Sequence, residues 1–406
     1  ANLIVRAQTS ATNVRTSGIS RTKERPLPRP STRRASSKTM SQRSFIVSKQ
    51  VLSRYKTITK KLSSLGANEI LLDIDKFAFT ANNMTYAHAG GPPLNYWNFY
   101  DNLLDDNLRK ENGIIPVWGF ATCTKSRNPI IAEGSRHYGF YPMASSVVYN
   151  PSKASTPSFT VARSDSELAA VYNSYLNTET DPFYASLSCE NAMMVYRPLF
   201  LTSFFLDDYC SSKHQNVGHC VLTSASSKTA FGLAFQLRQR GVTVIGLTSE
   251  RNLGFCESLG LYSGLYTYDS IGDIQSNETT VVVDMAGSHD VNLSIDKHFG
   301  TRVVESIGVG MTHNTVLFGD RTTLSDHAQA TRKFFFAPAW IRRRIEEDAT
   351  IMERAASSYV EFTQRSEEKR WLEFNTNLSV EEVYALSESN SVNPNQGLIT
   401  RVQPTS

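Results

Sequence analysis

The sequence predicts an α/β protein in which a β-rich N-terminal domain precedes a domain built on a doubly wound parallel sheet. Short apolar runs bounded by Gly, Pro and Asn fill residues 46–160, which is typical of β-strands joined by turns. Strand and helix patterns then alternate over residues 217–320. Continuous β-branched runs such as TTVVVD (279–284) are typical of parallel strands that are buried on both faces. With 406 residues, the chain is long enough for two or three domains.

The first 45 residues differ in composition from the rest of the chain. They contain ten basic residues and one acidic residue, and they are rich in Ser, Thr, Arg and Pro. Such a segment buries too little apolar surface to offset the entropy of ordering, so we expect a disordered basic leader over 1–45. The same composition is typical of transit peptides. Two alternatives stay open: a transit peptide for the mitochondrion or plastid, or a disordered extension of a cytoplasmic protein.

The remaining residues carry 32 basic and 37 acidic side chains, so we expect no nucleic-acid partner. The most apolar window, NAMMVYRPLFLTSFFL (191–206), is interrupted by Arg197 and Pro198. We therefore expect no membrane span, and an intracellular, soluble protein. The five cysteines form no C-x-x-C pair and no Cys/His cluster with zinc spacing, which favours reduced thiols and no metal site.

The first predicted domain covers residues 46–185, with residues 325–380 contributing in part. Its expected strands lie in EILLDIDKFAFTANNMTY (69–86), GIIPVWGFATCTKS (113–126) and YGFYPMASSVVYNP (138–151). Helical spacing then predicts helices in DSELAAVYNSYL (165–176) and ENAMMVYRPLFLTSFFLDDYCSS (190–212).

The second predicted domain covers residues 186–324 and alternates strands with helices. The expected strands are 219–225, 242–249, 264–270, 279–287 and 301–310, and the expected helices are 229–241, 251–260 and 289–300. A further helical region follows Pro338, and residues 381–406 are expected to form a polar tail.

The turn TSASSKTA (223–230) follows the first of these strands. In a Rossmann fold, backbone N–H groups at this helix N-terminus hold the pyrophosphate of a dinucleotide. The usual glycines are replaced by small or hydroxyl-bearing residues, and a lysine adds positive charge. We expect cofactor contacts from Ser224, Ala225, Ser226, Ser227, Lys228 and Thr229. The alternative is a turn that binds no ligand.

The end of the second strand bears on the choice between NAD and NADP. Thr248, Ser249 and Arg251 suit the 2′-phosphate of NADP, whereas Glu250 would suit NAD. Arg251 could equally be a solvated residue at the start of a helix. Ala286 and Gly287, after the fourth strand, are also expected to contact the nucleotide.

The order of these motifs resembles the medium-chain dehydrogenase/reductase superfamily, in its zinc-independent, quinone-oxidoreductase-like branch. The resemblance covers roughly residues 46–365 and rests on TANNMTYAHAGG (80–91), CVLTSASSKTAFGLAFQL (220–237), VVVDMAGS (281–288) and VVESIGVGMTH (303–313). PVWGFA and FFAP are similar to a subfamily that is described only as a domain of unknown function. The resemblance implies a GroES-like N-terminal domain, a Rossmann domain and a homo-oligomer.

The resemblance also implies an active site between the domains, with a tyrosine beside the nicotinamide. The matching residue is Tyr86, which would orient the substrate or donate a proton; the alternative is a tyrosine that only packs. Asn83, on the same loop as Tyr86, would hydrogen-bond a carboxamide or a carbonyl of the substrate. His313 follows the carboxyl end of a strand and would touch substrate or nicotinamide, or else be an uninvolved loop residue. The aromatic NYWNFY (95–100) would line a pocket or belong to a core cluster.

These observations predict an NADPH-dependent reductase that transfers hydride to a small-molecule acceptor, without zinc. The acceptor would be an activated C=C, an enone or a quinone-like compound. The alternative is a non-catalytic dinucleotide-sensing or interaction protein on the same scaffold, which the missing glycines favour. A hydrolase is disfavoured because Ser203, in LTSFF, lies in no G-x-S-x-G motif.

Overall fold

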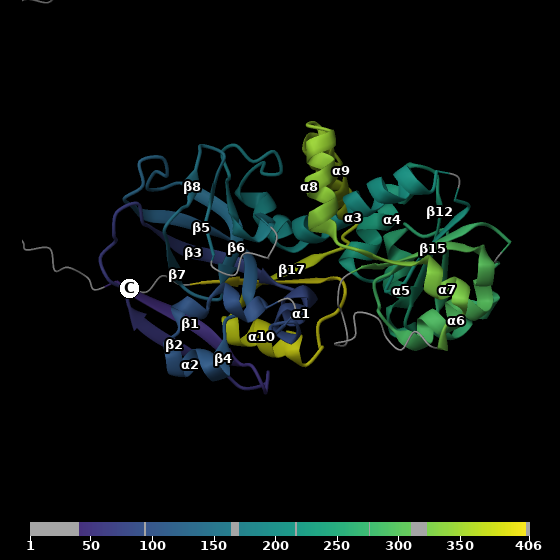
Figure 1. Ribbon diagram of the computed structural model, residues 1–406, viewed down its shortest axis with the longest axis horizontal. Helices are drawn as coiled ribbons and strands as arrows, with labels where there is room; N and C mark the ends of the chain where they lie inside the picture. The colour runs from purple at the N-terminus through teal and green to yellow at the C-terminus, as the bar shows by residue number, and fades with distance from the viewer. Residues whose placement is uncertain are drawn as a thin grey trace, which may run out of the picture. The chain divides into compact units, whose positions relative to one another are not determined.

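A computed structural model of the protein describes residues 40–92, 95–163, 170–215, 217–275, 277–309 and 323–402. These residues form an α/β fold with three β-sheets (Figure 1). Two sheets belong to the β-rich domain, and the third is a parallel sheet. The predicted fold class is therefore confirmed.

The β-rich domain contains a three-stranded sheet of order β2-β1-β4 and a nine-stranded sheet. The large sheet has the order β17-β18-β3-β5-β6-β10-β9-β8, with β7 also paired to β3. Its pairs are antiparallel except for β17 and β18, which run parallel. The strands are β1 (Ser41–Ser48), β2 (Tyr55–Lys61), β3 (Ile70–Phe79), β4 (Asn112–Gly113), β5 (Pro116–Ser126), β6 (Arg136–Pro142), β7 (Ser146–Tyr149), β8 (Lys153–Ala154), β9 (Ser158–Thr160), β10 (Ser174–Asn177), β17 (Glu373–Leu378) and β18 (Gln396–Arg401).

The third sheet has six strands in the order β13-β12-β11-β14-β15-β16, and all its pairs are parallel. Numbered along the chain from β11, this is the 3-2-1-4-5-6 order of a doubly wound Rossmann sheet. Every residue of β14 is buried, as its β-branched sequence predicts. The strands are β11 (His219–Leu222), β12 (Thr243–Thr248), β13 (Gly264–Thr267), β14 (Thr280–Asp284), β15 (Val303–Val309) and β16 (Arg332–Phe335).

Helices connect and cover these sheets. The α-helices are α1 (Ala81–His88), α2 (Asp106–Glu111), α3 (Glu190–Lys213), α4 (Lys228–Gln239), α5 (Glu250–Leu259), α6 (His289–Phe299), α7 (Asp326–Thr331), α8 (Ala337–Glu347), α9 (Ile351–Glu368) and α10 (Val380–Glu388). The 3-10 helices are η1 (Tyr96–Phe99), η2 (Asp101–Leu103), η3 (Ala170–Asn173), η4 (Leu187–Cys189), η5 (Tyr268–Asp273) and η6 (Gly300–Arg302). Among the described residues, no helix is both long enough and apolar enough to cross a membrane.

Local sequence explains where the helices of the parallel sheet begin and end. Ser227 and Ser288 cap α4 and α6, because their side-chain oxygens accept hydrogen bonds from the N–H groups of Ala230 and Val291. Gly260 ends α5 in the left-handed conformation, with φ at 64°, which glycine adopts without steric cost.

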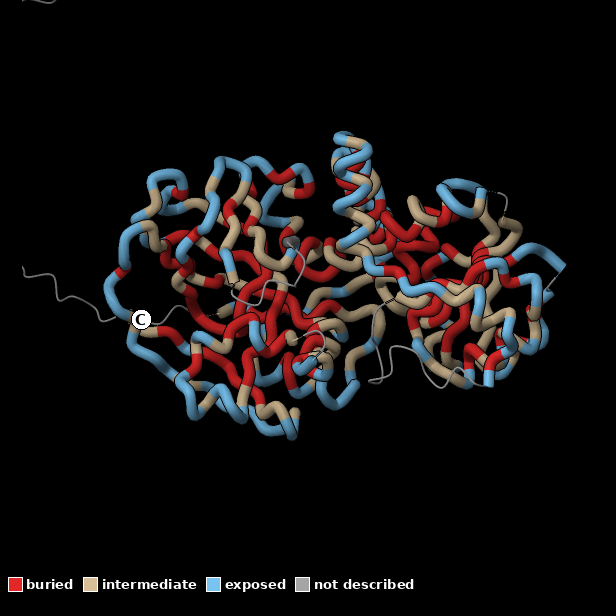
Figure 2. The backbone as a smooth tube through the Cα atoms, in the orientation of Figure 1, coloured by how far each residue is buried: buried red, intermediate tan, exposed pale blue. Residues whose placement is uncertain are grey.

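Buried apolar side chains form separate clusters in the described residues. Figure 2 shows the buried parts of the backbone in red. One cluster fills the β-rich domain. Another joins α3, α4 and α9 to one face of the parallel sheet, and a third joins α6 and η5 to the opposite face. Helix α3 contributes most to the second cluster, and its Arg197 is buried there in an ion pair with Asp181.

Two segments of the first half differ from their predicted structure. Residues Ala81–His88 form a helix instead of continuing the preceding strand or forming a loop. Thr80 and Asn83 provide a reciprocal capping box, which satisfies free N–H groups at the helix start and outweighs the alternating pattern. Of the helix predicted over 165–176, the described part is η3 followed by strand β10, whose Tyr175 is buried among aromatic rings. In that segment, tertiary packing overrides the helical spacing.

Three segments of the remaining chain also differ from the expectation. Residues Arg332–Phe335 form the sixth strand of the parallel sheet. The expected polar tail over 381–406 contains most of α10 and all of β18, and β18 lies between β17 and β3 in the large sheet. Leu398 and Ile399 are buried there, so these two apolar residues outweigh the polar composition around them. At the other end, β1 already begins at Ser41, within the expected leader.

Candidate functional site

The predicted turn lies at the point where the parallel sheet reverses its order. Strand β11 has β12 on one side and β14 on the other, and residues 223–227 follow its carboxyl end. In open α/β sheets, ligands bind outside the carboxyl ends of the strands at this position. The structure therefore brings the candidate residues after β11, β12 and β14 to one end of the sheet.

One residue of the turn has a backbone conformation that usually favours glycine. Ser224 adopts the left-handed conformation, with φ at 51°. Ala225 lies against β12, where a Cβ on Gly246 would come within 2.9 Å of the Ala225 Cβ. The backbone N–H groups of Ser226, Lys228 and Thr229 make no hydrogen bond to another described residue. The start of α4 therefore presents open donors, as an anion site requires.

Two tyrosines that the sequence reasoning missed hold this turn. The Tyr268 hydroxyl accepts a hydrogen bond from the Ser224 N–H over 3.1 Å. The Tyr262 hydroxyl donates to the Ala225 carbonyl oxygen over 2.6 Å. In addition, Asn252 of α5 donates to the Ser226 Oγ over 3.2 Å. These side chains provide the support for a turn that lacks the usual glycines.

Lys228, the first residue of α4, is half-buried and has no acidic partner in the described part of the chain. Its Nζ donates to the Pro394 carbonyl oxygen over 3.0 Å. Burial lowers the pKa of Lys228 to about 8. The first residue of α4 therefore carries an amino group that no carboxylate among the described residues neutralises.

The predicted residues after β12 have different environments. Thr248 is buried, Ser249 precedes α5 as its N-cap residue, and Arg251 is exposed in the first turn of that helix. Within the described residues, Arg251 makes no ion pair. Its guanidinium is therefore available to a ligand at the end of β12, as a 2′-phosphate site would require.

Ala286 and Gly287 form a tight turn after β14. Gly287 is exposed and has φ at 63°, a conformation that favours glycine. The N–H groups of both residues donate to the Asp284 Oδ1, over 3.1 and 3.0 Å. The shape of this turn therefore depends on the buried Asp284, which the sequence reasoning did not single out.

Tyr86 and Asn83 both lie on α1. Tyr86 is buried, with its ring 4.6 Å from that of Tyr96 and 5.4 Å from that of Phe140, and burial raises its pKa well above the usual value. The Asn83 Oδ1 accepts from the Thr80 N–H over 2.7 Å, and its Nδ2 donates to the Pro116 carbonyl oxygen over 2.8 Å. In this structure, the Asn83 amide is bonded to backbone on both sides.

The aromatic segment NYWNFY belongs to the core of the β-rich domain, one of its two predicted alternatives. Tyr96, Trp97, Phe99 and Tyr100 are all buried in the same cluster. A Cβ on Gly90 would come within 2.0 Å of the Trp97 Nε1, so the glycine makes room for this ring.

His313, the third predicted catalytic residue, lies outside the described residues. Ser203 is buried, and its hydroxyl donates to the carbonyl oxygens of Leu199 and Thr229. Among the described residues, no three His, Cys, Asp or Glu side chains gather as a metal site would require.

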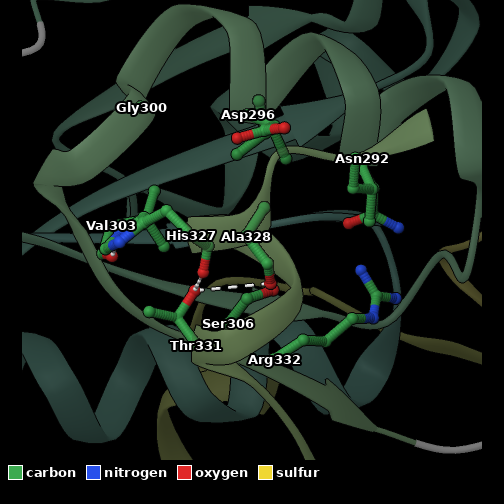
Figure 3. A pocket seen from close by; sticks show the side chains of 11 residues that line it. Asn292, Asp296, Gly300, Val303, Ser306, His327, Ala328, Thr331 and Arg332 are labelled. Carbon is green, nitrogen blue, oxygen red and sulfur yellow. Dashed lines mark hydrogen bonds between the residues drawn. The ribbon is translucent and has the colours of Figure 1, made fainter. Parts of the chain in front are cut away.

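Two hollows in the described part of the chain lie away from the predicted residues. A cavity of about 20 Å³ between α6, α7 and β15 is lined by Asn292, Asp296, Ser306, His327 and Arg332, among others (Figure 3). A space of that size holds water but no mononucleotide. A larger groove, of about 520 Å³, lies between β1, the end of β17 and the start of α10. The candidate site is therefore defined by the strand ends and not by these hollows.

Solved structures share this fold over most of the chain. The quinone oxidoreductase from Coxiella burnetii is 13% identical, with a TM-score of 0.53. CurA from Vibrio vulnificus in complex with NADPH is 10% identical, with a TM-score of 0.57. The yhdH oxidoreductase from Salmonella enterica in complex with NADP is 12% identical, with a TM-score of 0.53. Each match covers 89% of this chain and 100% of the other.

The chain therefore has the fold of these solved structures, with a GroES-like and a Rossmann domain, as the resemblance seen in the sequence implied. At identities this low, the likeness concerns the fold. The family model described as "Protein of unknown function (DUF2855)" matches residues 77–389, and the chain belongs to this family. No curated protein matches the chain.

Proposed function

We propose that this protein is an NADPH-dependent reductase of an activated C=C, an enone or a quinone-like small molecule, and that it works without zinc. The observation that carries the proposal is Lys228. Its amino group has no acidic partner among the described residues, and the residue begins α4 at the reversal point of the sheet, where backbone N–H groups are open. This combination suits a phosphate group. Two solved structures of the same fold are NADPH or NADP complexes by their own descriptions.

The residues present fit a dinucleotide. The N–H groups of Ser226, Lys228 and Thr229 would hold the pyrophosphate, together with the Lys228 Nζ and the hydroxyls of Ser224 and Ser227. Ala225 is buried against β12, so it would support the turn from the core side. Arg251, with Thr248 and Ser249, would hold the 2′-phosphate, and Ala286 and Gly287 would contact the nicotinamide half. When bound, NADPH would supply the hydride for the reduction.

Tyr86 would orient the acceptor. A buried phenol with a raised pKa stays protonated at neutral pH, so its hydroxyl donates a hydrogen bond instead of accepting a proton. Asn83 would act as a positioning residue, because it ties the start of α1 to the Pro116 carbonyl oxygen. His313 remains a proposed contact to substrate or nicotinamide.

Calorimetry on the full chain tests the proposal, with NADPH, NADH and inorganic pyrophosphate as ligands. We expect NADPH to bind more tightly than NADH. Lys228→Ala should weaken NADPH and pyrophosphate binding by about tenfold, or ~1.4 kcal/mol. Lys297→Ala, on the exposed last turn of α6, is the matched control and should leave both unchanged. If neither nucleotide binds, the reductase proposal is wrong.

A second candidate function follows from Tyr268, whose hydroxyl occupies the Ser224 N–H. This bond favours a non-catalytic interaction protein that keeps the fold without the nucleotide. If NADPH binds but enones and quinones are not reduced, the protein would instead be a dinucleotide sensor.

The exposed Phe334 and Phe336, on and after the edge strand β16, suit a homo-oligomer, which light scattering would detect.

A further inference from the structure

Asp284, the last residue of β14, has a buried carboxylate that accepts hydrogen bonds from several donors. Its Oδ1 accepts from the Thr223 hydroxyl over 2.9 Å and from the N–H groups of Ala286 and Gly287. Its Oδ2 accepts from the Asn292 Nδ2 over 2.8 Å and from the Arg332 guanidinium over 2.9 Å. Both oxygens are therefore satisfied, as a buried carboxylate requires.

Thr223 links this carboxylate to the first strand. It directly follows β11, and its Oγ1 also accepts from the N–H groups of Met285 and Ala286, over 2.8 and 2.9 Å. One threonine hydroxyl and one carboxylate thus bind three successive N–H groups after β14. These bonds set the path of the turn that follows β14, on the opposite side of β11 from β12.

Arg332 supplies the charge that balances Asp284. It lies at the start of the edge strand β16, two strands from β14, and its side chain reaches back to the Asp284 Oδ2. The side chains of Arg332 and Asn292 lie next to each other at the wall of the small cavity (Figure 3). An unpaired carboxylate at this end of the sheet would repel phosphate, whereas the paired one leaves the local charge balanced.

We infer that Asp284, with Thr223 and Arg332, positions the 284–287 turn for the nicotinamide half of the dinucleotide. The inference rests on the proposed function and deepens it. A Rossmann sheet consists of two mononucleotide-binding halves, and β14 is the first strand of the second half. The adenosine half would bind at the first half, which β11 to β13 form. Loosening the turn after β14 should therefore weaken the binding of the nicotinamide half and leave the binding of the adenosine half unchanged.

Thr223→Val tests the inference with the smallest structural change, since it removes the hydroxyl and keeps the shape of the side chain. Affinity for NADPH and for 2′,5′-ADP, which carries only the adenosine half, would be measured by calorimetry on the full chain. We expect NADPH binding to weaken about tenfold, as for the loss of ~1.4 kcal/mol, and 2′,5′-ADP binding to change less than about twofold. Thr223→Ser should restore NADPH affinity, because it keeps the hydroxyl.

Arg332→Met gives a second, electrostatic test of the same turn. It leaves the Asp284 carboxylate without its counter-charge, so NADPH affinity should again fall while 2′,5′-ADP affinity is kept. The matched control is Asp207→Asn, which breaks the Asp207–Arg240 pair between α3 and α4, with a 2.8 Å contact. This control should leave the ratio of the two affinities unchanged. Circular dichroism would establish that each variant is folded.

The outcomes separate the inference from the proposed function. If Thr223→Val lowers the affinities for NADPH and 2′,5′-ADP equally, or lowers neither, the positioning role is wrong. Absence of NADPH and 2′,5′-ADP binding to the unmodified chain would overturn the proposed function, and the inference with it. Selective loss of NADPH, restored by Thr223→Ser, is the result that supports the positioning role.

Discussion

The Lys228 Nζ donates a hydrogen bond to the Pro394 carbonyl oxygen over 3.0 Å. The two residues lie 166 positions apart, at the first residue of α4 and in the connection between α10 and β18. A carbonyl oxygen is a weak partner for an ammonium group that is half-buried, which is why burial lowers the pKa of Lys228 to about 8. The contact leaves a charge that a phosphate would stabilise better.

NADPH binding should depend on pH through Lys228. Below about pH 8 the amine is protonated and attracts phosphate; above it the amine is neutral. We therefore expect the affinity to fall as the pH rises from 7 to 9, measured by calorimetry. In Lys228→Met this fall should be absent. An equally steep fall in that variant would assign the pH dependence to another group.

The Lys228 amine should also make the stability of the fold depend on pH, but stability should rise with pH where NADPH affinity falls. Its folded pKa lies below the unfolded value, so between about pH 8 and 10.5 the unfolded chain binds more protons and stability rises with pH. At pH 7 the charged, half-buried amine costs stability. Lys228→Met should therefore raise the free energy of unfolding at pH 7 by about 1 kcal/mol, a figure reduced for its partial exposure. Urea unfolding at pH 7 and pH 10 would measure this gain, which should shrink at the higher pH.

The buried pair of Arg197 and Asp181 should be essential for stability. The Arg197 guanidinium also lies 4.4 Å from the ring centroid of Phe183 and 4.8 Å from that of Tyr138. Asp181→Asn removes the counter-charge and leaves a buried cation, so it should lower the free energy of unfolding by about 3 kcal/mol. Glu347→Gln breaks exposed pairs on α8 and should lower the free energy of unfolding far less, because solvent screens these charges. Similar losses in urea unfolding for the two variants would contradict the prediction.

Two helical glycines should respond oppositely to substitution. A Cβ on Gly232 in α4 would lie 2.8 Å from the Ser203 Oγ of α3, so Gly232→Ala should cost about 1–3 kcal/mol by overpacking. Gly254 in α5 has open space around it, and Gly254→Ala should stabilise by about 0.5–1 kcal/mol. Thermal unfolding of both variants is the measurement. A stabilised Gly232→Ala would show that α3 and α4 pack less closely than described.

Cys189 should be the first cysteine to react with an alkylating reagent. It is partly exposed, whereas the other four cysteines are buried. Burial raises the pKa of Cys123 and Cys256 to about 11 and that of Cys210 to about 12. Iodoacetamide at pH 7.5 should therefore label Cys189 in the folded protein and the others only after unfolding. Peptide mass spectrometry would locate the label, and early labelling of Cys220 would contradict the expected order.

The parallel sheet was the part of the fold that local patterns predicted best. Its first five strands and three of its helices follow from apolar runs and caps that neighbouring residues determine. Strand β16 was missed because RKFF is a short segment, and its pairing with β15 is a long-range contact. Strand β18 was missed for a similar reason, since its few buried residues stand in a polar stretch of the sequence.

The candidate site divides in the same way. The small residues of the turn and Lys228 stand together in the sequence, so their place after the first parallel strand could be predicted from spacing, and their contact with a cofactor stays a prediction. Tyr262, Tyr268 and Arg332 act through partners 37 to 48 residues away, which no local pattern records. Asp284 had a signal, since it ends a buried strand at the carboxyl edge of the sheet, where open α/β folds bind ligands.

By itself, the sequence determined the α/β class, the order of alternating strands and helices and the position of the turn after the first parallel strand, because periodicity and capping act over a few residues. Only the tertiary structure decided how Ser224 is held in its left-handed conformation, what neutralises Asp284 and which group faces Lys228. Those outcomes depend on strand order and on side chains that meet across the sheet. Such contacts form only when distant segments pack together, so local composition cannot encode them.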